Sequence, residues 1–163
     1  MRNDGANTTV LSRAECLVLL RSAAVGRVVY TDQALPAILP VTYAMDGDQA
    51  LIIRTAPGSK FDAALRGAIV AFEIDDVDTA ARTGWSVTVV GPARAVTSEA
   101  EAHRLARLLP RPWVPGRRDA FIRITVRQVS GRRLFSGAGR PHGALPGAGG
   151  GFMSTADARP GRR

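Results

Sequence analysis

Short runs of β-branched and aromatic residues, each bounded by a turn signal, recur along this 163-residue chain. The clearest pair of runs flanks Asp46-Gly47-Asp48, residues typical of a hairpin turn between two apolar strands. Hairpins pair their strands antiparallel, because parallel strands need a crossover of a dozen or more residues. The sequence therefore predicts an antiparallel sheet or barrel, mainly β, and excludes an alternating βαβ array.

Six strands and three short helices are expected. The strands are predicted at 27–31, 36–45, 49–55, 68–75, 84–96 and 120–135, and the helices at 12–23, 59–67 and 98–110. Pro40 indicates an edge, a bulge or a strand end, since proline lacks the N–H of a ladder bond. Gly91-Pro92 indicates a bulge, and an acidic loop is expected after residue 75.

Capping boxes mark the first and third helices. Ser12 is followed three residues later by Glu15, and Ser98 by Glu101, the spacing in which the two residues satisfy each other's backbone N–H groups. Cys16 falls on the apolar side of the first helix, where a buried and unreactive thiol is expected.

Charge and composition divide the chain into three parts. The net charge is +8, but residues 131–163 hold six Arg and one Asp. We expect a flexible arm at 1–10, one domain at 11–135 and a disordered Gly/Pro/Arg-rich tail at 136–163. The tail lacks the interleaved aromatic residues that stack on bases, which argues against nucleic-acid binding.

No run of about 20 apolar residues or secretory signal is present, so neither a membrane span nor export is expected. With one cysteine the predicted location is the cytoplasm.

The segment at 52–65 combines a strand end, a Pro-Gly turn and a helix start. Arg54, Thr55, Ser59 and Lys60 there offer two charges and two hydroxyls beside free backbone N–H groups, which suits a phosphate. A capped helix with solvated charges is the alternative. The chain contains neither GxxxxGK[ST] nor GxGxxG after a strand, so P-loop and Rossmann proteins are excluded.

Other chemistry is not indicated. The two histidines, His103 and His142, lack ligand spacing for a metal, and an acidic cluster at 75–78 lacks the spacing of a calcium loop. No nucleophile or dedicated acid or base is identified. Trp85 and Trp113 could each belong to the core or form the wall of a planar-ligand site.

The motifs ILPVTYAMDGDQALIIRTAPGSKFDAAL, VAFEID and TGWSVTVVGPARAV occur in the order found in the flavin-binding split-barrel family that includes pyridoxamine 5′-phosphate oxidase. The chain resembles its small actinobacterial branch over residues 12–135. The resemblance implies a six-stranded antiparallel split β-barrel with short flanking helices, which forms a homodimer with two cofactors at the interface.

The same resemblance implies a set of cofactor-binding residues. Pro40, Val41, Thr42 and Tyr43 would lie along the flavin ring, and Trp85 and Ser86 would contact it. Arg54 and Thr55 would flank the ribityl phosphate, and Ser59 and Lys60 would bind it. Trp113 and Arg123 would complete the site from the partner chain.

The activity implied is hydride transfer between a flavin and a small substrate. FMN is favoured because a compact Arg/Ser/Lys set suits a single terminal phosphate, and the deazaflavin coenzyme F-420 is the alternative cofactor. Haem is the least favoured, since no histidine lies in the predicted barrel core. The additional Arg and His residues with which the true oxidase binds pyridoxamine phosphate are not found. A non-catalytic flavin-binding protein is the alternative function.

Overall fold

The computed structural model describes residues 7–58, 60–109 and 119–136. Eight strands and three helices lie within these ranges. The strands are β1 (Thr8–Val10), β2 (Val25–Asp32), β3 (Leu35–Asp46), β4 (Ala50–Thr55), β5 (Ile69–Asp78), β6 (Thr83–Ala95), β7 (Ala120–Thr125) and β8 (Gln128–Leu134). The helices are α1 (Arg13–Ser22), α2 (Lys60–Leu65) and α3 (Glu99–Ala106).

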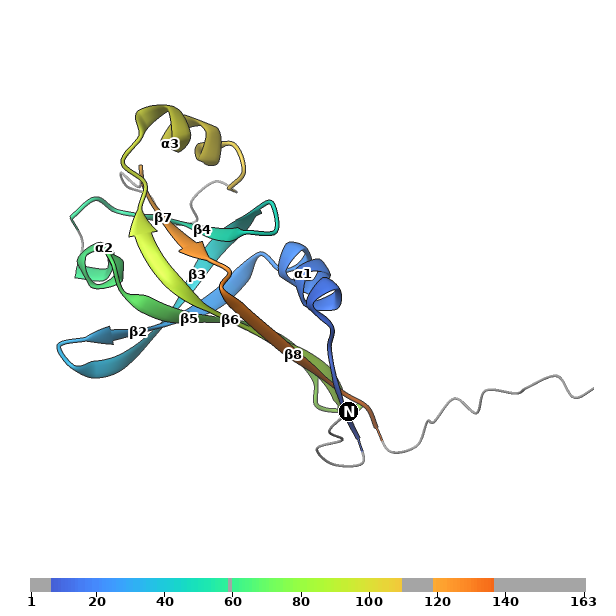
Figure 1. Ribbon diagram of the computed structural model, residues 1–163. Helices are drawn as coiled ribbons and strands as arrows, with labels where there is room; N and C mark the ends of the chain where they lie inside the picture. Colours follow the sequence, from blue (N-terminus) through green and yellow to red (C-terminus); the bar gives the residue numbers. More distant parts are fainter. Residues whose placement is uncertain (1–6, 59, 110–118, 137–163) are drawn as a thin grey trace, which may run out of the picture.

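Six of these strands form a closed ring. The order β6-β5-β2-β3-β4-β7 returns to its start because β7 also pairs with β6, and every pairing is antiparallel (Figure 1). β8 pairs with the first part of β6, and β1 adds to β8. The prediction of a mainly β, six-stranded antiparallel split barrel with short helices is confirmed.

Two long strands close the ring by changing partners. β3 pairs with β2 as far as Thr42 and with β4 from Tyr43 onward. β6 pairs with β5 as far as Pro92 and with β7 from Ala93 onward. The backbones are tight at this second exchange: a Cβ on Gly91 would lie 1.7 Å from the carbonyl oxygen of Thr125.

The structure corrects the bulge expected at Gly91-Pro92 and bears out the edge among the three alternatives expected at Pro40. Gly91 pairs with Val70 and Pro92 with Ile69 in unbroken register, so no bulge interrupts the β5–β6 ladder there. The proline marks a change of partner instead. β3 likewise runs unbroken through Pro40, which pairs with Arg27. At Pro40 the strand has a neighbour on one side, so the missing N–H interrupts no second ladder.

Three strand assignments differ substantially from those predicted. The single strand expected at 120–135 is two strands, because its antiparallel register against β6 shifts by one residue between Val90↔Gln128 and Ala93↔Ile124. At this shift the Thr125 carbonyl accepts from the Arg127 N–H at 2.9 Å. The expected acidic loop begins later, since Asp76–Asp78 continue β5 in pairing with β6. Thr8–Val10 of the expected arm form β1. Residues 1–6 and 137–163 lie outside the described residues, so the arm and the tail there stay predictions.

The helices begin where the caps predict. Ser12 and Glu15 form the full capping box of α1, and Ser98 accepts from the Glu101 N–H at the start of α3. Cys16 is fully buried, and burial raises the pKa of its thiol. In the described part of the chain, no helix is long and apolar enough to cross a membrane.

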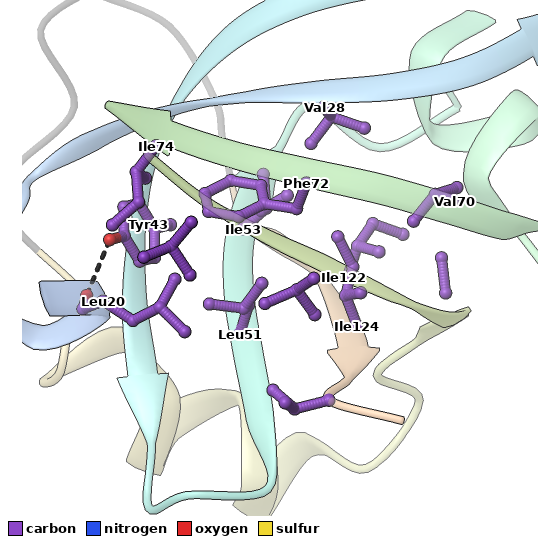
Figure 2. Packing of buried hydrophobic residues seen from close by; sticks show 14 of the residues in the cluster. Leu20, Val28, Tyr43, Leu51, Ile53, Val70, Phe72, Ile74, Ile122 and Ile124 are labelled. Carbon is purple, nitrogen blue, oxygen red and sulfur yellow. Dashed lines mark hydrogen bonds between the residues drawn. The ribbon is translucent and has the colours of Figure 1, made fainter. Parts of the chain in front are cut away.

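The main core fills the ring. It is built from the inward side chains of the barrel strands together with α1, and Figure 2 shows Leu51, Ile53, Phe72 and Ile122 packed within it. A second, smaller cluster lies between α3 and the opposite face of β4 and β7, around Ile52, Leu105 and Phe121. The ring therefore uses both faces of β4.

We predict that Gly91→Ala lowers the free energy of unfolding by about 1–3 kcal/mol, the usual cost of overpacking, because the new methyl group overlaps the Thr125 carbonyl. Urea unfolding measures the change. Gly47→Asn is the control: Gly47 has a φ of +62° with no atom near its Cβ position, and asparagine tolerates that conformation. Equal stability of Gly91→Ala and wild type would contradict the close approach.

Candidate functional site

Strand alternation gives the barrel wall an inner and an outer face. Val28, Phe72, Val87 and Val89 are buried in the core, so their strand neighbours point outward. We call the outward side of β2, β3, β5, β6 and β8 the outer face. Its residues used below are Val25, Arg27, Ile38, Pro40, Thr42, Ile69, Glu73, Asp75 and Ser86.

Pro40, Thr42 and Ser86 share the outer face, with β2 and β5 lying between β3 and β6. Pro40 pairs with Arg27. The Arg27 guanidinium in turn reaches the Asp75 carboxylate at 2.6 Å, and Asp75 pairs with Ser86. An apolar strand surface and two hydroxyl-bearing residues thus flank one charged group.

That charged group was not singled out from the sequence. Arg27 also pairs with Glu73 at 3.0 Å, and the hydrogen bonds that it donates to Asp75 and Glu73 raise the pKa of the Arg27 guanidinium. The only signal in the sequence is the period-two spacing of the two carboxylates on β5. Their juxtaposition with Arg27 depends on the β2–β5 register, which the sequence does not specify.

Val41, Tyr43 and Trp85 lie on the inner face. Tyr43 is buried, packs edge-on against Phe72 and donates its hydroxyl proton to the Leu20 carbonyl at 2.6 Å (Figure 2). Burial raises the pKa of this hydroxyl. Val41 and Trp85 are partly buried against the same core. These three side chains therefore face away from Pro40, Thr42 and Ser86.

Arg54 and Thr55 point to opposite sides of β4. The Arg54 guanidinium donates to the Ala106 carbonyl of α3 at 3.1 Å and lies 5.3 Å from the centre of the Phe121 ring. Its Nε is buried without a hydrogen-bond partner. Thr55 is buried on the barrel side of the strand. Arg54 thus holds α3 against the barrel, and a role in phosphate binding stays a prediction.

Arg123 is engaged in a charged cluster beneath α3. Its guanidinium donates to Asp46 at 2.5 Å and to Glu101 at 2.7 Å, and Arg104 donates to both carboxylate oxygens of Asp46 at 2.8 and 2.9 Å. The hydrogen bonds from Arg104 and then Arg123 hold the pKa of Asp46 far below its ordinary value. We call these four residues the α3 clasp.

The remaining predicted site residues are only partly described. Ser59 and Trp113 lie outside the described residues, and Lys60 is the first residue of α2. The start of this helix is occupied in part by the chain itself, because the Asp62 carboxylate accepts from the Gly58 N–H at 3.3 Å. Asp62 also binds Arg66 at 2.7 Å.

The ring of six strands and its flanking helices define this chain as a split β-barrel protein with an open outer face. The chain belongs to the pyridoxamine 5′-phosphate oxidase family, whose family model matches residues 12–133. It is 40% identical over 136 residues to Rv0080, an uncharacterized protein of Mycobacterium tuberculosis, and the match covers 80% of this chain and 88% of that one.

Solved structures agree with this assignment. An FAD binding protein of Mycobacterium smegmatis is similar with a TM-score of 0.69 and 36% identity, covering 79% of this chain and 100% of that one. An FAD-binding protein of Mesorhizobium loti gives a TM-score of 0.66 at 25% identity, covering 79% of this chain and 98% of that one.

Asp46→Asn should weaken the α3 clasp. A carboxylate whose pKa is lowered by folding contributes stability that is full above its unfolded pKa of about 4 and is lost as pH falls below that value. We therefore expect the substitution to reduce the free energy of unfolding by about 1–2 kcal/mol at pH 7 and to flatten its decline below about pH 4. Urea unfolding between pH 2 and 7 measures both effects, and Asp32→Asn, at an exposed carboxylate, is the control.

Tyr43→Phe should cost stability without affecting the outer face. The substitution leaves the Leu20 carbonyl without its buried donor, so we expect a loss of about 1 kcal/mol in the free energy of unfolding. Thermal unfolding measures it. An unchanged melting temperature would show that the hydroxyl contributes nothing to the core.

Proposed function

We propose that this protein is a homodimeric flavin-dependent oxidoreductase whose cofactor lies on the outer face, between two copies of the chain. The observation that carries the proposal is that Pro40, Thr42 and Ser86 share this face of a pyridoxamine 5′-phosphate oxidase family barrel. Two solved relatives are described as FAD binding proteins, which supports a flavin as the ligand class.

The outer face suits both a planar ring and a second copy. Val25, Ile38 and Ile69 are exposed on it, an apolar surface that a monomer leaves in water. Side chains of this kind can cover the faces of a flavin ring, and the Thr42 and Ser86 hydroxyls can bond its polar edge. The donor set therefore fits the ring of the cofactor.

The predicted phosphate-binding residues fit the cofactor less completely than the residues proposed to contact its ring. Arg54 is held by α3 and Thr55 is buried, which leaves Lys60 as the charged residue of the predicted phosphate set without a described structural role. When bound, the flavin would supply the hydride chemistry. The chain would orient the ring along β3, exclude water between two outer faces and stabilise negative charge with Arg27 or Lys60.

FMN, FAD and coenzyme F-420 are the candidate cofactors. FMN matches a single phosphate contact at Lys60, whereas the solved relatives named above are described with FAD. An absorption spectrum of the purified protein, followed by titration with each cofactor, decides among them. Saturable binding of none of the three would overturn the proposal.

Lys60→Ala is expected to weaken binding of the preferred cofactor by about 1–3 kcal/mol, the cost of a lost charge-assisted contact. Isothermal titration calorimetry measures the change. Arg13→Ala, which removes an exposed charge at the start of α1, is the control. Unchanged affinity in Lys60→Ala would remove the phosphate assignment.

Ile38→Asp should convert the dimer to a monomer and abolish flavin binding, because it buries a charge in the proposed interface. Val18→Asp on α1 is a matched control, since Ile38 is 64% exposed and Val18 is 63% exposed. Light scattering measures the mass of each variant. A monomeric wild-type protein at micromolar concentration would contradict the interface.

Catalysis is separable from binding. The alternative function, a flavin-binding protein without turnover, rests on the two outer-face carboxylates, Glu73 and Asp75, which are both engaged in ion pairs with Arg27. Chemical reduction of the bound cofactor, followed by a screen of electron acceptors, distinguishes the two. Reoxidation no faster than that of free flavin with every acceptor would favour the non-catalytic protein.

A further inference from the structure

A recess of about 440 Å³ lies on the inner face, where β5, β6 and β8 extend beyond the barrel. Trp85, Asp76, Arg133 and Phe135 line it, and we call it the Trp85 pocket. Because Trp85 and Ser86 are consecutive in a strand, the pocket lies on the opposite side of β6 from the outer face. It is therefore separate from the proposed flavin site.

Three of its residues form one row across three strands. Trp85 pairs with Asp76 of β5 on one side and with Arg133 of β8 on the other. Neighbouring strands are about 4.8 Å apart, so a carboxylate and a guanidinium stand one strand to either side of the indole. A bicyclic ring stacked on the indole could reach both groups. Phe135 follows Arg133 on the same face and adds a second aromatic side chain.

The polar groups of the row are incompletely satisfied. The Arg133 Nε is buried and has no hydrogen-bond partner, a costly state for a charged donor. Within the described residues, no hydrogen bond is found to the Asp76 carboxylate, whereas Asp78 accepts from the Ala80 and Ala81 N–H groups at 2.9 and 2.8 Å. The Arg133 guanidinium also interacts electrostatically with Glu15 of α1. The row thus places a guanidinium and a carboxylate on either side of a stacking surface.

We propose that the Trp85 pocket binds a purine base, with guanine as the best match. The base would stack on the Trp85 indole, as bases do on aromatic side chains in other proteins. Guanine presents the O6 and N7 acceptors that arginine recognises, and its N1–H and N2–H groups form a donor pair for one carboxylate. A simple anion would meet the charges of Asp76 and Asp78, and a purely apolar ring would offer no hydrogen bond to the Asp76 carboxylate or the Arg133 guanidinium.

Guanosine titration tests this assignment directly. The chain has two tryptophans, so Trp113→Phe leaves Trp85 as the sole indole reporter. We expect saturable quenching of its fluorescence by guanosine and none by uridine, whose single ring cannot span the row. Absence of saturable quenching at millimolar guanosine, or equal quenching by uridine, would overturn the proposal.

Two pairs of variants in the same background locate the contacts. Arg133→Met and Asp76→Asn should each weaken guanosine binding about tenfold or more, the scale of a lost charged hydrogen bond. Arg132→Met and Asp75→Asn, the same changes one residue away on the opposite face, should leave it unchanged. Equal losses in the controls would overturn the proposal.

Asp76 is exposed, so Asp76→Asn keeps the test decisive if Arg133→Met fails to fold. Flavin titration of Arg133→Met and Asp76→Asn with Trp113 retained is the independent readout, since Trp113 belongs to the predicted cofactor-binding set. Guanosine binding without flavin binding would refute the proposed function alone, and flavin binding without guanosine binding would refute the Trp85 pocket alone.

Discussion

The close approach of β6 to β7 at Gly91 is the constraint on which the rest of the barrel depends. There β6 leaves β5 and joins β7, and the missing side chain lets the Thr125 carbonyl come within the space of a Cβ. Without the β6–β7 pairing the sheet would remain open, since this additional pairing joins β7, at one end of the strand order, back to β6. The apolar inner face of one continuous sheet is thereby enclosed as a core.

Closure also separates the two faces by function. Adjacent residues on one strand point to different faces: Tyr43 bonds to α1 from the core, while Thr42 lies on the outer face. Trp85 and Ser86 divide in the same way. A single strand can therefore stabilise the barrel and present a ligand site because its side chains alternate, and a mutation moved by one residue should change a different property.

Local features were predictable where their physical cause is local. The capping box of Ser12 and Glu15, the hairpin at Asp46-Gly47-Asp48 and the antiparallel ring follow from short-range signals. The division of 120–135 into β7 and β8 did not, because both strands fit one apolar pattern and only pairing with different parts of β6 distinguishes them. β1 was missed because three residues carry too little pattern to identify a strand.

The candidate site shows the same limit. Motif resemblance grouped Arg54 and Arg123 with the cofactor, which stays a prediction, and in the structure register and helix placement direct both side chains toward α3. Arg54 donates to a carbonyl at the end of that helix, and Arg123 joins two carboxylates beneath it.

An arginine that is already paired with two carboxylates binds a phosphate weakly, because moving its side chain would leave both partly buried carboxylates without that partner. α3 is thus attached by the same kind of residue that would otherwise bind an anion. In this family member, anion recognition would then depend on the strand-to-helix turn before α2.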